Sequence, residues 1–153
     1  MRYIIGLGNS AMADDGVGLR IVEHFARSGL ERGFEAVAIA DEGTRLLSYL
    51  TRDTEKIVLV DAVDMGLEPG EYRLFRPDEV ESRKRPKRGL TSHEGDILKV
   101  LQLAASLGYP VPRITILGIQ PENVGPGLEL SEALGRRFET YLRAALEEIA
   151  RDS

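Results

Sequence analysis

Three residues that could bind a metal ion or move protons come from separate parts of the chain: Asp15, Asp61 and His93. Carboxylate and imidazole ligands together suit first-row metals such as nickel or zinc. The sequence has no cysteine, which excludes thiolate metal sites, disulfides and a cysteine nucleophile. The three residues therefore predict a metal site with three protein ligands and open positions.

Each of these residues also has a structural interpretation. Asp15, or its neighbour Asp14, could cap the helix that follows. Asp61 could serve a turn, and His93 could be a surface residue at a helix start. The positive end of that helix favours a neutral imidazole, which can bind a metal. The other histidine, His24, flanks an apolar stripe, and we expect it to be structural.

Alternating strands and helices must position these side chains. Apolar runs and helical periodicity predict the following elements: strands at 2–7, 34–40, 57–60, 72–75 and 114–119, and helices at 16–28, around 46–50, from 91 to about 107, and after 127. The run 57–60 is continuously apolar, as in a strand buried on both faces. The connection to 72–75 is too short for a crossover helix, which predicts a short antiparallel strand there. We expect the charged stretch 79–89 to be a loop.

This order predicts an α/β fold with a mostly parallel sheet and helices on both faces, in one domain over residues 1–153. Ligands of such sheets bind at the carboxyl ends of the strands, near a switch in strand order. Polar residues follow every predicted parallel strand or precede the helix at 91: Asn9, Asp14, Asp15, Asp41, Glu42, Thr44, Asp61, Asp64, Ser92, His93, Gln120 and Glu122.

Other classes fit less well. The segment Gly6 to Ala11 matches a relaxed dinucleotide-binding fingerprint, but Asp14 and Asp15 would repel a pyrophosphate at the next helix start. Ser92 precedes His93 directly, yet no Gly-x-Ser-x-Gly motif indicates a serine hydrolase. A net charge of −5 disfavours a nucleic-acid ligand. Neither a membrane span nor a signal peptide is expected from the sequence.

Five motifs give the chain a strong resemblance to the hydrogenase maturation proteases: Gly6-Leu7-Gly8-Asn9 with Asp14-Asp15-Gly16-Val17-Gly18, the turn Asp41-Glu42-Gly43-Thr44, Val60-Asp61-Ala62, Thr91-Ser92-His93-Glu94, and Gly118-Ile119-Gln120-Pro121-Glu122. Gly6 to Asn9 also resembles the peptidyl-tRNA hydrolases. Those continue with Pro-Gly and a nearby catalytic histidine, whereas here Ser10-Ala11 follows and the first histidine is His24.

The resemblance implies an endopeptidase, often classed as aspartic-type, that trims the C-terminal extension of the large subunit of nickel-iron hydrogenases. It implies a three-layer α/β/α sandwich around a five-stranded twisted sheet with one antiparallel edge strand, in a cytoplasmic, monomeric enzyme. The metal-binding triad would be Asp15, Asp61 and His93. Some members carry Glu at the position of Asp15. Nickel would arrive already bound to the precursor, and other divalent metals could substitute.

On this resemblance we hypothesise that Asp15, Asp61 and His93 complete the coordination of nickel held by the precursor's cysteines. Asp15, Asp61 or a metal-bound water would then support hydrolysis. We expect substrate contacts from residues at the same edge of the sheet: Asn9, Glu42, Gly43, Thr44 and Gln120. The loops 83–88 and 120–127 would select the substrate. The non-enzyme alternative is a nickel-binding accessory protein that uses the same three ligands and leaves the precursor intact.

Overall fold

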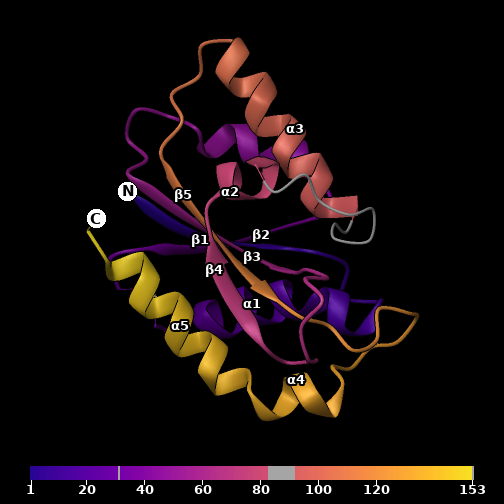
Figure 1. Ribbon diagram of the computed structural model, residues 1–153. Coiled ribbons are helices and arrows are strands. Elements are labelled where there is room, and N and C mark those ends of the chain that lie inside the picture. Colours follow the sequence, from indigo (N-terminus) through magenta and orange to yellow (C-terminus); the bar gives the residue numbers. More distant parts are fainter. Residues whose placement is uncertain (31, 83–91, 153) are drawn as a thin grey trace.

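Five strands form one sheet in the order β2-β1-β3-β5-β4 (Figure 1). The computed structural model describes residues 1–30, 32–82 and 92–152, without the side chains of 80–82 and 92–96. The elements are β1 (Arg2–Leu7), η1 (Ala13–Gly16), α1 (Val17–Ser28), β2 (Glu35–Ala40), η2 (Gly43–Tyr49), β3 (Lys56–Ala62), β4 (Tyr72–Phe75), α2 (Pro77–Ser82), α3 (Ser92–Ser106), β5 (Arg113–Ile119), α4 (Glu132–Arg136) and α5 (Phe138–Ala150). The two η elements are 3₁₀ helices.

Four strands are parallel, and β4 is antiparallel to β5 at one edge, as the sequence predicted. The chain passes from β1 to β2 on one side and then to β3 on the other. The strand order therefore switches between β1 and β3, where an open α/β sheet has its ligand crevice.

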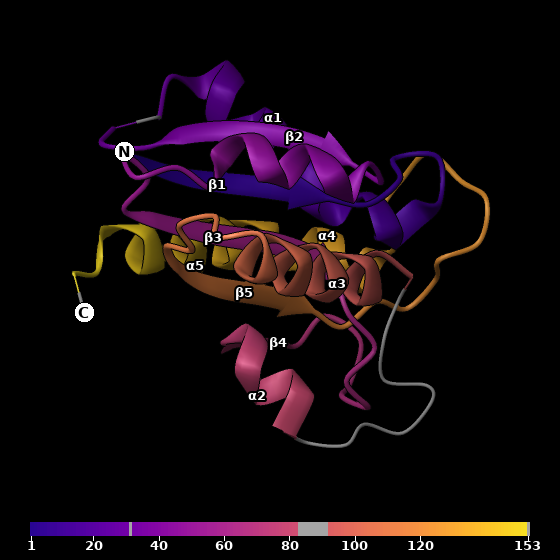
Figure 2. The same ribbon diagram turned by 90° about the horizontal axis from the view of Figure 1, so that it is seen from above.

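Helices cover both faces of the sheet, which confirms the predicted three-layer sandwich. One core joins α1 and α5 to the sheet, and the other joins η2 and α3 to the opposite face (Figures 1 and 2). Every residue of β3 is buried, as expected for the central strand of such a sheet. In the described ranges, no helix combines the length and apolar character that a membrane crossing requires.

Two predictions of local structure need correction. The stretch expected to be a loop from residue 79 begins instead within α2, because Pro77 fits a first helical position and the Glu79 carboxylate accepts from the Arg76 N–H at 2.7 Å; residues 83–89 lie outside the described part. The last helix is divided, since Arg137 leaves helical geometry at φ −105° and ψ 10°.

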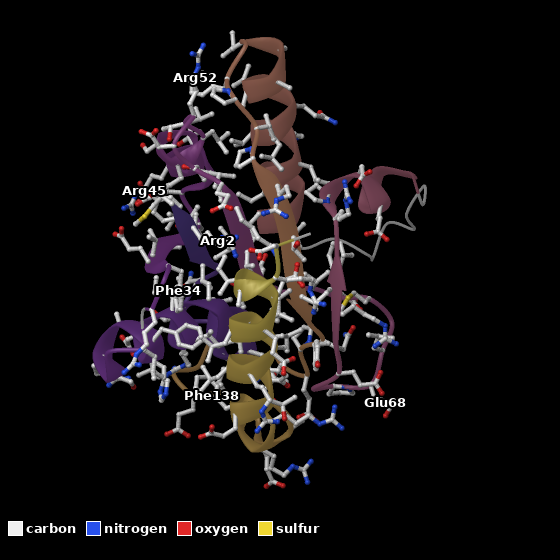
Figure 3. The ribbon with its side chains drawn as sticks, turned by 90° about the vertical axis from the view of Figure 1, so that its left-hand side faces the viewer. Arg2, Phe34, Arg45, Arg52, Glu68 and Phe138 are labelled. Carbon is white, nitrogen blue, oxygen red and sulfur yellow. The ribbon has the colours of Figure 1, made fainter. Side chains whose placement is uncertain are left out.

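A polar cluster fastens α5 to the amino-terminal end of the sheet. The Lys56 ammonium, 1% exposed, donates to the Arg151 carbonyl at 2.8 Å and lies 3.3 Å from the Glu148 carboxylate. The Thr115 hydroxyl donates to the same carboxylate at 2.9 Å. Arg2, beside this end of α5 in Figure 3, pairs with Asp152 at 2.6 Å. This cluster stabilises the amino-terminal end of the sheet, opposite the end that carries the predicted site.

The cluster predicts a dependence of stability on acid. Burial raises the pKa of Glu148, but hydrogen bonds from Thr115 and Lys56 outweigh it and hold the pKa below 4.5. A lowered folded-state pKa stabilises the fold at neutral pH, and that contribution disappears as the pH falls below about 4.5. We expect Glu148→Gln to lower the free energy of unfolding by about 1–3 kcal/mol at pH 7. When this free energy is measured by urea denaturation at several pH values, it should fall less steeply below about pH 4.5 in the variant than in the parent. The exposed neighbour Glu147→Gln should behave like the parent; equal curves for both variants would contradict the assignment.

Candidate active site

Asp15 lies in η1, directly after the loop that leaves β1, and is 7% exposed. Its Oδ2 accepts from the Asn9 N–H at 3.0 Å, and the Asn9 amide oxygen accepts from the Ala11 N–H at 2.9 Å. These bonds fold the loop back on itself and fix the carboxylate at the carboxyl end of the sheet. Neither aspartate caps α1, because its N-cap is Gly16, without a side-chain hydrogen bond.

Asp61 lies near the end of β3 and is 1% exposed. Its Oδ1 accepts from the Ala62 N–H at 2.8 Å. Gly6 of β1 pairs with Val60 of β3, so the carboxyl ends of these two parallel strands lie side by side. The second carboxylate therefore lies at the switch point, beside the loop that carries Asp15, as the strand pattern predicted.

Gly8 allows the segment that carries Asp15 to pack closely against the end of β3, which carries Asp61. Its φ is +121°, and a Cβ added there would lie 1.9 Å from the Asp15 carbonyl oxygen and 3.7 Å from Asp61 Oδ1. Gly18 allows a similar approach of α1 to β3, since a Cβ there would lie 2.2 Å from the Val60 carbonyl oxygen. The glycines of this turn thus bring backbone to backbone around the carboxylates.

Gly8→Ala is expected to lower the free energy of unfolding by about 2 kcal/mol or more, because the left-handed φ and the backbone clash add. Gly135→Ala is the matched control: its Cβ would meet nothing within 4 Å. In a helix that change is neutral or stabilising by up to about 1 kcal/mol. Urea-denaturation midpoints measure both. Equal stability of the two variants would show that the turn tolerates a side chain.

His93 falls in the first turn of α3, which places its backbone at the end of the helix that meets the carboxyl edge of the sheet. Its imidazole lies outside the described side chains, so its part in the triad stays a prediction. Among the side chains that are described, no three histidine, aspartate or glutamate groups gather closely enough to hold a metal ion. The donor types of the predicted triad, two carboxylates and an imidazole, suit nickel or zinc.

The predicted substrate-binding residues divide into two groups. Glu42 and Thr44 are exposed at the end of β2, with the half-buried Gly43 between them. Gln120 is 7% exposed, and its side-chain oxygen accepts from the N–H groups of Met65, at 2.7 Å, and Leu67. Gln120 thus holds the loop that leaves β3. Contact of these residues, and of the half-buried Asn9, with substrate stays a prediction.

Two alanines in left-handed geometry border the site, Ala13 with φ 50° and Ala40 with φ 51°. The pairing of β1 with β2 shifts its register just before Ala40. The Ala40 carbonyl accepts from the Gly8 N–H at 3.1 Å. Strained backbone of this kind costs on the order of 1 kcal/mol per residue and gathers at functional sites. Sequence reasoning missed both positions, because alanine gives no signal of a positive φ.

Sequence reasoning also missed Ser131, which donates to the fully buried Asp14 carboxylate from both its N–H and its hydroxyl, at 2.7 and 2.8 Å. The only local signal was a serine three residues before Leu134, a spacing typical of a helix N-cap. Ser131 does cap α4.

Comparisons with known proteins identify the family and the fold of the chain. A model of the family described as hydrogenase maturation protease matches residues 19–148. The hydrogenase expression/formation protein HoxM of Azotobacter vinelandii is 35% identical over 151 residues, covering 96% of this chain and 71% of HoxM. HupD of Bradyrhizobium diazoefficiens is 35% identical over 121 residues, covering 77% of this chain and 61% of HupD.

Among solved structures, the [NiFe] hydrogenase maturation protease HybD from Thermococcus kodakarensis matches with a TM-score of 0.80 and 25% identity, covering 97% of this chain and 99% of HybD. This match extends over the sheet and both helical layers, whereas the chain spans less than two thirds of the length of HupD. The family match, the identity to HoxM and the shared fold agree: the chain belongs to the hydrogenase maturation proteases, a family of peptidases.

Proposed function

We propose that this chain is an endopeptidase that removes the C-terminal extension of a nickel-loaded precursor of a nickel-iron hydrogenase large subunit. The observation that carries the proposal is the placement of Asp15 and Asp61 next to Gly8, at the switch point of the sheet. Both carboxylates are more than nine-tenths buried. A buried carboxylate is costly for stability, and two of them at the switch point of the sheet favour a role in function.

The proposed reaction is hydrolysis of one peptide bond. Asp15 or Asp61 takes a proton from a water molecule, whose oxygen attacks the scissile carbonyl carbon, and the proton passes to the leaving amine. Nickel belongs to the substrate here. Asp15, Asp61 and His93 would complete its coordination, so that only a loaded precursor is held with its scissile bond over the carboxylates.

The same proposal includes the setting of the reaction. We assign the protein to the cytoplasm and treat it as a monomer that acts on one precursor at a time. The loop 120–127 and the exposed residues Glu42 and Thr44 border the carboxylates at the same edge and would meet the precursor's polypeptide.

Intact-mass measurement tests the proposal. Purified protein is incubated with nickel-loaded precursor, and the precursor is expected to lose the mass of its extension. The double variant Asp15→Asn/Asp61→Asn is the control and should leave the precursor at full length. A precursor that binds the wild-type protein but keeps its mass would identify a nickel-binding accessory protein instead.

A further inference from the structure

Asp14, the neighbour of Asp15, has no exposed surface, and its carboxylate accepts four hydrogen bonds. Oδ2 accepts from the N–H groups of Glu122, at 2.9 Å, and Asn123, at 3.1 Å. The Ser131 N–H donates to Oδ1 at 2.7 Å, and the Ser131 hydroxyl donates to Oδ2 at 2.8 Å. All four donors come from the segment that follows β5, and they compensate the burial of the charge.

The main chains of the same two segments are also joined. The Asp14 N–H donates to the Asn123 carbonyl at 2.9 Å, and the Ala13 N–H donates to the Gly127 carbonyl at 2.8 Å. The Gly127 N–H donates to the Ala11 carbonyl at 2.9 Å. Figures 1 and 2 show the indigo segment after β1 beside the orange segment after β5, beyond the arrowheads of the sheet. Asp14 therefore fastens the segment 122–131 to the loop that carries Asp15.

The fastened segment presents apolar side chains to solvent. Val124 is 47% exposed and Leu128 is 75% exposed. Arg20 of α1 donates to the Leu128 carbonyl, which holds this end of the segment as well. Because the backbone of this segment is already held at both ends, it loses little conformational entropy when a partner binds. Such a preorganised segment with two exposed apolar side chains suits a docking surface.

We propose that Asp14 is a positioning residue: it holds the segment 122–131 at the border of the active site, where Val124 and Leu128 receive the polypeptide of the hydrogenase precursor. This inference rests on the proposed function. It assigns the two neighbouring aspartates different tasks, since Asp15 faces the reaction and Asp14 organises the surface beside it.

Hydrogen exchange tests the fastening without any substrate. In Asp14→Asn, the amide group replaces one acceptor oxygen, so the N–H groups of Glu122, Asn123 and Ser131 should exchange at least about tenfold faster. The amides of β3 should keep their parental rates. Parental exchange at the three loop amides would overturn the fastening role.

Kinetics test the positioning. Asp14→Asn is expected to raise KM for the precursor about tenfold while kcat changes less than about threefold, because β1 and β3 still place Asp15 and Asp61. Asp14→Glu should not restore KM, since the fully buried position has no room for a further methylene. An unchanged KM, or a loss confined to kcat, would overturn the proposal.

A second variant keeps the test valid if Asp14→Asn folds poorly. Leu128→Ser should raise KM at least about threefold without a change in Tm. Leu107→Ser is the matched control, because Leu107 is 63% exposed just beyond the end of α3, far from the carboxyl edge. Equal KM values for the two variants would overturn the docking role. Failure of the wild-type protein to shorten the precursor would instead refute the proposed function.

Discussion

Asp61→Asn is expected to reduce precursor processing by about a hundredfold to ten-thousandfold, the range that a positioned acid–base group contributes. The substitution keeps the shape of the side chain, and the asparagine oxygen can still accept from the Ala62 N–H. The free energy of unfolding should therefore not fall by more than about 1 kcal/mol. Single-turnover cleavage of nickel-loaded precursor and urea denaturation measure the two quantities.

The control is Asp53, which is exposed and lies just before β3, at the amino-terminal end of the sheet. Asp53→Asn should process the precursor at the parental rate. If Asp61→Asn cleaved as fast as Asp53→Asn, the carboxylate would have no chemical role, and the burial of Asp61 would need a structural explanation.

His93→Ala is expected to abolish processing of nickel-loaded precursor, with a loss of about a hundredfold or more, because the predicted triad loses its only nitrogen ligand. The fold should persist, since alanine favours the helical geometry of α3. The assay compares cleavage by His93→Ala with cleavage by His24→Ala. His24 packs edge-on against Phe138, with ring centroids 5.9 Å apart, so that variant should lose stability and keep activity.

The opposite pattern would be decisive against the triad. Normal processing by His93→Ala would leave Asp15 and Asp61 as a carboxylate pair that acts without an imidazole. Another polar residue at the carboxyl end of the sheet, such as Glu42, would then be the candidate for the third group of the site.

The sheet and the two carboxylates could be predicted from the sequence because their signals are local. The continuous apolar run of β3 indicated a central strand. Parallel strands all end on the same side of a sheet, so polar residues that follow them lie on that side however the helices pack. Asp15 and Asp61 were therefore placed at a common edge without any knowledge of contacts. Glycine types around Asp15 indicated the close approach that Gly8 provides.

The partners of the buried polar groups could not be predicted, because they depend on tertiary structure. Asp14 and Ser131 are 117 residues apart, and no spacing rule joins them. Gln120 follows β5 as expected, yet which loop its amide holds is decided by the path of the chain after β3. The division of the last helix at Arg137 is likewise invisible in a sequence whose apolar stripe continues across it.

The mass of the precursor, followed with and without nickel, tests the central claim most directly. Wild-type protein should shorten the nickel-loaded precursor by the mass of its C-terminal extension and leave the nickel-free precursor at full length. That difference would arise because Asp15, Asp61 and His93 hold the scissile bond only through the metal. Equal shortening of both forms would contradict recognition of the metal, and shortening of neither would contradict the assignment as an endopeptidase.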